Sequence, residues 1–392
     1  MKKVGIITLY YNNDNYGGIA QAYALNKYIQ NLGMDSELIS YKRSPVKKMS
    51  VKEHIKKEGL FSYLKAKFEM LPLKLKLKIT NKYAVFRYQR LLQEKIIIRK
   101  EAFARSRQRI PHSIVLTEQT IEECIGEYDI YISGSDQIWK PGVLQPPYVF
   151  EFLPRKYKRI SYASSITVTS FPDGYGKYMQ ENLSLYSWIS VRENCSRDYL
   201  EDLLHRKVDV VVDPTLLLNR TEWEDITSKR IINERYMFVY LLGEDSKQRK
   251  IISKYAKSNN LKIVTLPHVE GKIRAADIKF GDYQLYDIDL SHFFSLIKYA
   301  EIVCTDSFHA VVFSNIFEVQ FWVFERIVLS KKANMNSRID TLLRALKEDD
   351  RYVKASQQFK PELADNIDFQ EKKKLINNLV TYSATQLKNA LL

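Results

Sequence analysis

The polar residues around His309 could bind an anion and act on it as a general acid. A strand-like segment runs from Glu301 to Thr305, Asp306 and Ser307 follow it, and an apolar helical run begins at Ala310. We expect Asp306 to cap this helix, whose free N–H groups would favour an anion at the carboxyl end of a parallel strand. A bound phosphate would favour protonated His309. A histidine that only packs at a helix start is the alternative.

Two arginines could hold carboxylate or phosphate groups. Arg192 and Glu193 stand at the end of the strand-like segment Trp188 to Val191, and the planar fork of arginine suits both anions. A salt bridge between neighbouring elements would also account for this pair. Arg338 is recommended only by its place in Ser-Arg-Ile, because arginines on helix surfaces are common.

Hydroxyl, carboxylate and amide groups gather after the strand-like segment Tyr128 to Ser133. They belong to Ser135, Asp136 and Gln137. Such groups suit sugar recognition or the deprotonation of a hydroxyl, and Asp136 is the candidate base. Simple helix capping is the alternative for Ser135 or Asp136 alone.

A glycine-bearing turn near the start of the chain could approach a ligand. Asn12 to Gly18 includes Gly17, whose lack of a side chain lets a ligand come close to the backbone. The turn lacks the G-x-G-x-x-G order and a Walker lysine, so ordinary turn chemistry stays open. From position alone, Asn15, Tyr16 and Gln21 are further candidates to contact a sugar.

Other polar residues are interpreted as structural. Asp213 precedes Pro214, a pair that commonly begins a turn. Cys124, Cys195 and Cys304 have neither disulfide nor zinc spacing, and no histidine or carboxylate cluster has metal spacing. We therefore predict no tightly bound metal and a reducing, cytoplasmic setting.

Strand and helix patterns alternate along the chain. Val4 to Tyr10, a helix that ends at Gly33, and Glu37 to Tyr41 form a β-α-β unit. Further strand-like segments are Tyr128 to Ser133, Arg159 to Ala163, Trp188 to Arg192, Val208 to Val212, Tyr236 to Leu242, Leu261 to Leu266, Glu301 to Thr305 and Val319 to Phe324. This alternation predicts an α/β protein with parallel sheets.

We expect two Rossmann-like domains. A capping box at Thr221 to Glu224 indicates a helix start just beyond a boundary near residue 216. The expected units are residues 1–215, with a basic helical insertion at about 42–110, residues 216–345, and a helical tail at 346–392 that packs back through Leu375, Leu379, Leu387 and Leu391.

Composition excludes two broad classes. With 392 residues, 45% of them hydrophobic, the chain can bury large cores, so a disordered protein is excluded. Even the apolar stretch Val311 to Phe324 is broken by polar residues, so no segment is expected to span a membrane. The apolar run Val4 to Tyr11 after Lys2 and Lys3 fits a buried strand better than a signal peptide, because Asn12 to Asn15 continue it poorly.

One segment holds the whole charge excess of the chain. Residues 42–109 contain 21 Lys and Arg but 5 Asp and Glu, a difference of +16 against +15 for the whole chain. Apolar and basic residues alternate from Leu71 to Lys78, and Phe61, Tyr63, Leu64 and Phe68 add bulk. An anionic membrane surface and a solvated helical insertion both fit this pattern. Nucleic acid is not expected, because no reader motif accompanies the cations.

Taken together, the motifs resemble the polysaccharide pyruvyl transferase family. The residues that carry the resemblance are Asn15 to Gly18 with Gln21 to Leu25, Gly134 to Trp139, Ser161 to Ser165, Ser190 to Glu193, Asp213 to Leu218, Thr305 to His309 and Ser337 to Ile339. The resemblance covers roughly residues 1–340, except for the basic segment.

The resemblance implies two nucleotide-fold domains that face each other in a GT-B-like arrangement. It also implies phosphoenolpyruvate as a co-substrate, no other cofactor, and a sugar acceptor that is polymeric or lipid-linked and destined for the cell surface. The basic segment at about 42–110 would then place the protein at the inner face of the membrane. His309 and Asp136 would be catalytic, and Arg192, Glu193, Ser307 and Arg338 would bind the donor. Asn15, Tyr16, Gly17, Gln21, Ser135 and Gln137 would bind the acceptor.

One departure from the family pattern weakens the donor assignment. Many members carry an arginine two residues before the histidine, where this chain has Ser307. Another cation must then grip the donor. A glycosyltransferase that uses a nucleotide sugar, and a non-catalytic polyanion-binding protein, are the alternative functions.

Overall fold

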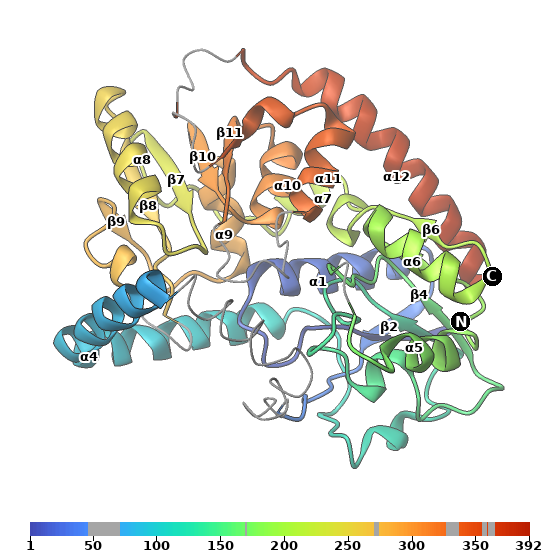
Figure 1. Ribbon diagram of the computed structural model, residues 1–392. Helices are drawn as coiled ribbons and strands as arrows, with labels where there is room; N and C mark the ends of the chain where they lie inside the picture. The colour runs from blue at the N-terminus through green and yellow to red at the C-terminus, as the bar shows by residue number, and fades with distance from the viewer. Residues whose placement is uncertain (46–70, 169–170, 270–273, 327–336, 355–358, 360–364) are drawn as a thin grey trace.

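Two parallel sheets form the frame of the molecule (Figure 1). The computed structural model describes residues 1–45, 71–168, 171–269, 274–326, 337–354, 359 and 365–392. The described strands are β1 (Lys3–Ile7), β2 (Asp35–Leu38), β3 (Ile130–Ser133), β4 (Lys158–Ser161), β5 (Ser190–Val191), β6 (Asp209–Val210), β7 (Tyr236–Tyr240), β8 (Lys262–Thr265), β9 (Tyr283–Gln284), β10 (Ile302–Thr305), β11 (Phe321–Phe324) and β12 (Tyr352–Val353).

Helices connect and cover these strands. The described α-helices are α1 (Tyr16–Asn31), α4 (Leu71–Arg107), α5 (Tyr175–Leu183), α6 (Asn194–Leu204), α7 (Arg220–Glu224), α8 (Ser246–Ser258), α9 (Leu290–Lys298), α10 (Phe308–Phe317), α11 (Ser337–Leu346) and α12 (Phe369–Leu391). Short 3-10 helices are η1 (Ile121–Cys124), η2 (Pro146–Val149), η3 (Pro214–Leu216), η4 (Ala275–Asp277) and η5 (Asp349–Arg351).

Strand order places the predicted functional loops side by side. The first sheet has the order β2-β1-β3-β4 and the second the order β12-β11-β10-β7-β8-β9, with parallel pairing throughout. Ile7 pairs with Ser133, and Tyr240 pairs with Thr305. The loop after β1 therefore starts beside the loop after β3, and the loop after β7 starts beside the His309 segment.

The boundary near residue 216 stays a prediction, but the two sheets divide there. The first sheet and the small β5-β6 pair use strands before it, and the second sheet uses strands after it. One apolar core nevertheless runs through both halves. Trp223 packs on Phe294 and Phe313, and Tyr16 of α1 stacks on Phe293 of α9 with ring centroids 4.4 Å apart.

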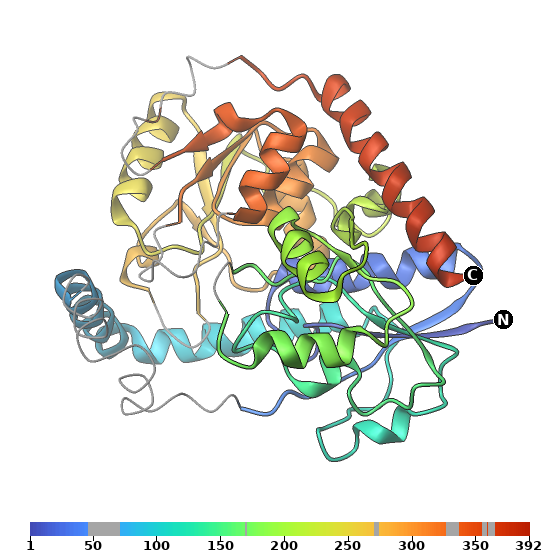
Figure 2. The same cartoon turned by 45° about the vertical axis from the view of Figure 1, so that its right-hand side comes forward.

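The C-terminal helix returns to the start of the chain. Figures 1 and 2 show α12 running from the second sheet toward the first, so that both termini lie close together. Leu387 and Leu391 are fully buried, and Lys2 Nζ donates a hydrogen bond to the carbonyl oxygen of Leu391 at 3.1 Å. Leu375 is partly buried against the core, whereas Leu379 is exposed.

Two capping predictions were wrong. Helix α7 is capped by Asn219, not Thr221, because Glu222 is at the third helical position after Asn219 and closes the box with it. Helix α10 is preceded by Ser307, whose side chain makes no capping bond, and Asp306 points elsewhere.

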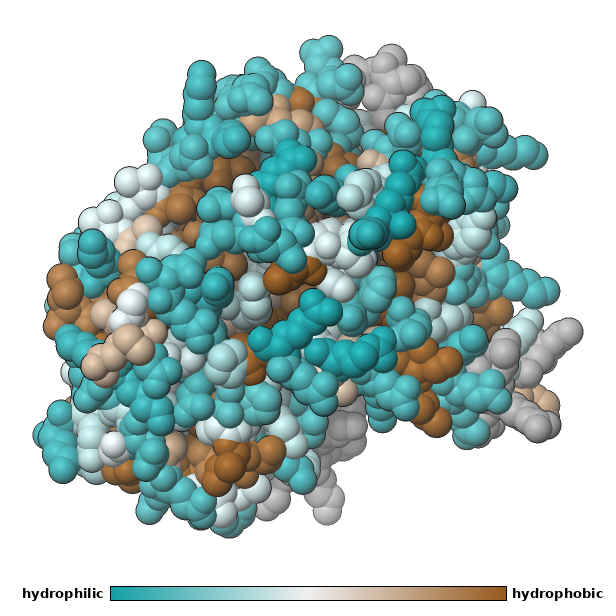
Figure 3. Space-filling model, turned by 180° about the vertical axis from the view of Figure 1, so that it is seen from behind, coloured by the Kyte–Doolittle hydropathy of each residue, from teal (hydrophilic) through white to brown (hydrophobic). Residues whose placement is uncertain are grey.

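The basic segment is described only in part. Residues 71–107 form the single helix α4, whereas the predicted bulky residues Phe61, Tyr63, Leu64 and Phe68 lie outside the described residues. No helix in the described ranges is long and apolar enough to cross a membrane. The face seen from behind is mostly hydrophilic, with separate apolar patches (Figure 3).

Candidate active site

Arg192 is the centre of a buried charged cluster, and it lies at the carboxyl end of a strand in the first half of the chain. It follows β5, and its Nη1 donates to Asp213 Oδ2 at 2.5 Å while its Nε lies 3.3 Å from Glu193 Oε1. Burial alone would lower the pKa of Arg192, but Glu193, Asp213 and Asp136 outweigh it and raise that pKa. Arg192 is therefore a permanent cation whose position is set by carboxylates.

The same carboxylates are held by hydroxyl groups. Ser165 Oγ donates to Glu193 Oε1 at 2.6 Å, and Ser135 Oγ donates to Asp213 Oδ2 at 3.3 Å. Ser135, which was predicted to bind the sugar acceptor, is thus fully buried and supports the cluster. Glu193 is likewise enclosed, so we interpret its role as holding Arg192 in place.

Arg338 joins the cluster from the other half of the chain. Its Nη1 lies 3.7 Å from Asp136 Oδ1, and Arg192 Nη2 lies 3.9 Å from the same oxygen. Both guanidinium groups also face the ring of Phe308, with their central carbons 5.0 Å (Arg192) and 5.8 Å (Arg338) from its centroid. Burial and the neighbouring Arg192 lower the pKa of Arg338 to about 10, against the effect of Asp136 and Glu193.

His309 is enclosed between α1 and Asp213. Its Nε2 is 3.6 Å from Asp213 Oδ2, and Gly17 is so close that a Cβ atom built there would be 1.9 Å from His309 Nδ1. Burial alone would raise the pKa of Asp213, but His309 and Arg192 hold it well below its usual value of 3.8. The Asp213 carboxylate is thus placed to stabilise an imidazolium ion at His309.

The start of α10 has no side-chain cap. Ser307 precedes the helix without a side-chain cap, and Asp306 instead accepts hydrogen bonds from the N–H groups of Leu242 and Gly243 at 2.7 Å each. Asp306 also accepts from Arg326 Nε at 3.1 Å. Asp306 therefore links the end of β7 to the end of β10 by hydrogen bonds. The first N–H groups of α10 receive no hydrogen bond from a capping side chain.

Three donors in this cluster make no hydrogen bond within the described part of the structure. They are Nη2 of Arg192, Nε of Arg338 and Nε2 of His309, all in buried or nearly buried side chains. Buried donors are almost always satisfied in proteins, so three such donors in one cluster are candidates to bind a ligand. An anion at the start of α10 would supply acceptor atoms.

Several predicted acceptor residues have structural roles. The Tyr16 hydroxyl donates to the carbonyl oxygen of Ile288 at 2.8 Å, and Asn15 caps α1. Gln21 is fully buried, and its Nε2 donates to Thr8 Oγ1 at 2.9 Å. Gln137 lies partly exposed beside Asp136.

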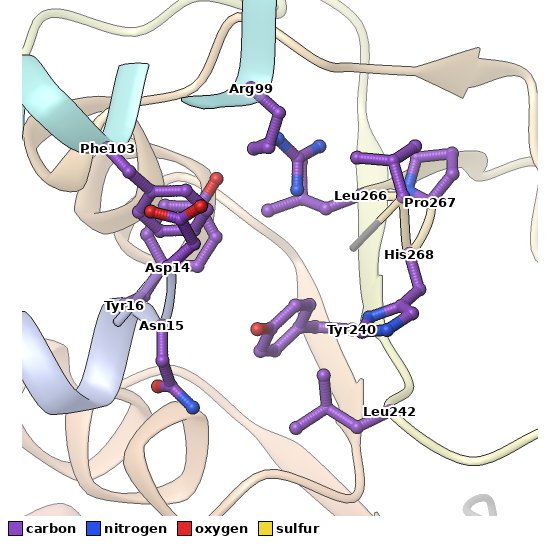
Figure 4. Close-up of a pocket in the computed structure, with 11 residues that line it drawn as sticks. Asp14, Asn15, Tyr16, Arg99, Phe103, Tyr240, Leu242, Leu266, Pro267 and His268 are labelled. Carbon is purple, nitrogen blue, oxygen red and sulfur yellow. The ribbon is translucent and has the colours of Figure 1, made fainter. Parts of the chain in front are cut away.

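A small pocket lies next to the cluster, between the two halves (Figure 4). Phe103 and residues 14–16 form one side, with Arg99 of α4 above them, and Tyr240, Leu242 and residues 266–269 form the other. Residues 15–17 connect the pocket to His309, because Gly17 contacts the imidazole ring. A second ligand group bound here would adjoin an anion at α10.

Sequence reasoning missed two members of the site and misjudged a third. Asp213 does begin a turn, through bonds to Thr215, but its second oxygen also serves Arg192 and His309. Lys140, just beyond the Gly134 to Trp139 motif, has its pKa lowered by burial and by Arg338. Arg326 has no motif around it, so its contact with Asp306 required the fold.

Metal ligation finds no support among the residues described. No group of three His, Cys, Asp or Glu side chains in the described ranges could hold an ion, and Cys124, Cys195 and Cys304 are unpaired thiols. The acidic residues of the cluster are instead engaged by arginines and hydroxyl groups.

Comparison with known proteins gives a family match and a fold match. The family model for polysaccharide pyruvyl transferase matches residues 15–326. No curated protein matches the chain. Among solved structures, a protein from Listeria monocytogenes described as a UDP-N-acetylglucosamine 2-epimerase has 11% identity and a TM-score of 0.50, covering 98% of this chain and 94% of its own.

Two further structures are similar in the same way. A UDP-N-acetylglucosamine 2-epimerase from Rickettsia bellii has 10% identity and a TM-score of 0.49, covering 100% of this chain and 96% of its own. MurG of Acinetobacter baumannii has 10% identity and a TM-score of 0.42, covering 99% of this chain and 100% of its own. At these identities the likeness concerns the fold alone, and the predicted GT-B-like α/β architecture is confirmed.

Proposed function

We propose, since the chain belongs to the polysaccharide pyruvyl transferase family, that it transfers the enolpyruvyl unit of phosphoenolpyruvate to a sugar and forms a pyruvate ketal. The acceptor would be a surface polysaccharide or its lipid-linked precursor. The observation that supports the proposal is a set of three buried donors, on Arg192, Arg338 and His309, that make no hydrogen bond in the described residues and lie in the cluster beside α10.

Phosphoenolpyruvate has the two anionic groups that this set requires. Its phosphate would accept hydrogen bonds from the first N–H groups of α10 and from one arginine, and its carboxylate would face the other arginine. Arg338 would thereby replace the arginine that many family members carry at the position of Ser307. Asp136, which lies within 4 Å of both guanidinium groups, would hold the two groups close together.

The reaction then needs two proton transfers. His309 would protonate the methylene carbon, with Asp213 stabilising the imidazolium ion, while a sugar hydroxyl attacks the neighbouring carbon and loses its proton to Asp136. The bond from that carbon to the phosphate oxygen breaks, and a second hydroxyl closes the ketal. One hydroxyl proton ends on the new methyl group and the other on the released phosphate, so atoms and charges balance without water or an oxidant.

The acceptor would approach at the mouth of the small pocket lined by residues 14–16. The rings of Tyr240, Phe103 and His268 offer apolar faces for a sugar, and the polar side chains of Asp14 and Asn15 lie at the same edge. A sugar there would reach the donor past residues 15–17. A nucleotide-sugar donor is the alternative, because Ser307 departs from the family pattern.

Calorimetric titration of phosphoenolpyruvate into wild type and an Arg338→Gln variant tests the donor site. We expect the variant to bind about tenfold to a hundredfold more weakly, because a hydrogen bond to a charged group contributes about 1.5–3 kcal/mol. Arg235→Gln, at an exposed salt bridge to Glu301, is the matched control and should bind like wild type. Unchanged binding in Arg338→Gln, or binding of a nucleotide sugar in place of phosphoenolpyruvate, would refute the assignment.

A further inference from the structure

The helix α4 exposes large apolar side chains away from the active site. Leu75 and Ile79, one helical turn apart, are 52% and 59% exposed, and Phe86 is 84% exposed. Ile97, further along the helix, is also mostly exposed. Single exposed apolar residues are normal on protein surfaces, and four on one helix are a candidate interaction surface.

The same helix is strongly cationic. Its 37 residues include eleven Lys and Arg but two acidic residues, Glu94 and Glu101. Lys82 and Lys100 are exposed beside the apolar side chains, and no residue of the helix is Asp. Exposed apolar groups among cations fit a partner that offers negative charge over an apolar layer.

The inner end of α4 lines the pocket between the two halves. Arg99 donates hydrogen bonds to the carbonyl oxygens of Tyr286 and Leu285, and with Phe103 it lines the pocket of Figure 4. Figure 1 shows the outer part of α4 extending beyond the body of the molecule. One helix therefore joins the pocket to the exposed apolar and basic surface.

We infer that the outer part of α4, with Leu75, Ile79, Lys82 and Phe86, docks on an anionic phospholipid surface. The phosphate groups of the lipids would meet the cations, and the apolar side chains would enter the boundary between head groups and acyl chains. Docking would bring the pocket to a membrane-bound acceptor. The inference stands on exposure and charge, and it does not depend on which group the enzyme transfers.

Sedimentation with vesicles tests this inference on the full-length protein. We expect the protein to pellet with vesicles of phosphatidylcholine and phosphatidylglycerol, less at high salt, and little with phosphatidylcholine alone. A variant with Ile79→Asp and Phe86→Asp should bind about tenfold or more weakly, because each loses the burial of a large apolar side chain. Phe86→Ser alone, with a smaller loss, keeps the test valid if the double variant unfolds.

Matched controls come from the exposed side of α8. Ile251→Asp, at an exposed isoleucine of that helix, should leave vesicle binding unchanged. Lys82→Glu should bind vesicles about tenfold more weakly, whereas Lys254→Glu on α8 should lose little. Equal binding of all variants, or tighter binding to duplex DNA than to anionic vesicles with no effect of Phe86→Ser, would overturn the inference.

Discussion

Contact between Gly17 and His309 shows how one missing side chain shapes the site. The first turn of α1 approaches the imidazole so closely that only glycine fits, and the other side of the ring faces Asp213. This explains why the glycine-bearing turn matters here without being a phosphate loop. The turn positions the predicted acid, and its backbone need not touch the ligand.

We predict that Gly17→Ala lowers turnover about a hundredfold while the protein stays folded. The new methyl group would displace His309, and a displacement of about 1 Å can have this effect on rate. Steady-state turnover together with thermal unfolding measures both properties. Gly176→Ala in α5, where the nearest atom is the flexible Tyr199 hydroxyl, is the control and should keep full turnover. Normal turnover in Gly17→Ala would show that His309 is not the critical group there.

Asp213→Asn should destabilise the protein by about 3–5 kcal/mol, because it leaves the buried Arg192 without its closest carboxylate. The pKa of Asp213 is depressed in the folded protein, so its stabilisation is fully present above pH 3.8 and is lost as the pH falls further. Urea unfolding over a pH series measures this. The variant should lose less stability than wild type on acidification, and identical acid profiles would contradict the assignment.

At the residue scale, sequence predicted the strand-end positions of His309, Arg192 and Asp136 and not their partners. Each stands after an apolar strand-like segment, which local pattern reveals. Asp213 looked like an ordinary turn residue because its bonds to Arg192 and His309 join segments far apart in the chain. The prediction that Asp306 caps α10 was wrong for the same reason. Asp306 accepts hydrogen bonds from N–H groups that follow the neighbouring strand β7, which is distant in the sequence.

At the scale of elements, hydrophobic pattern predicted the strands well because parallel strands are buried on both faces. The segments β3, β7, β10 and β11 are buried along their whole length. Element ends were less predictable. By residue type, both Asn219 and Thr221 could cap α7. Asn219 is the cap because Glu222 forms the capping box with it.

A buried carboxyl group between α10 and η5 gives a prediction at this scale. Glu348 is 1% exposed, its Oε2 accepts from Asn315 Nδ2 at 3.2 Å, and burial raises its pKa to about 7. A raised carboxyl pKa stabilises the fold at low pH, and this stabilisation is lost as the pH rises from 4.5 through about 7.

We therefore expect Glu348→Gln to be more stable than wild type above pH 7, by about 2–3 kcal/mol, and close to it under acidic conditions. Urea unfolding at both extremes of pH is the measurement. Glu123→Gln, at an exposed position of η1, should show no such pH-dependent difference. A Glu348→Gln variant that is destabilised above neutrality would indicate that the carboxylate is needed by Lys372 or Arg351.

At the scale of the whole molecule, α12 ties the two halves together. Ser383 Oγ accepts a hydrogen bond from the N–H group of Val212 at 3.0 Å, and Tyr382 donates to Asp209 at 2.7 Å. The leucine spacing of the tail predicted a final helix, but its contacts with β6 and the N-terminus required the fold. The charge of residues 42–109 predicted a surface role, and our inference assigns that role to the outer part of α4.

Leu387→Ala should lower the free energy of unfolding by about 2–5 kcal/mol, because Leu387 is fully buried where α12 meets the core. Leu379→Ala on the exposed side of the same helix should change it by about 0.5 kcal/mol or less. Denaturant unfolding of both variants makes the comparison. Equal effects would mean that α12 does not pack as described.

Product analysis tests most directly whether the protein transfers pyruvate from phosphoenolpyruvate with His309 as the acid. Phosphate release and product mass should be measured with phosphoenolpyruvate and a panel of soluble and lipid-linked sugars, for wild type and His309→Ala. We predict a sugar that gains one pyruvate ketal in wild type, with one phosphate released per ketal, and loss of both in the variant. No ketal with any acceptor, together with transfer from a nucleotide sugar, would contradict the account, and full turnover in His309→Ala would remove its catalytic acid.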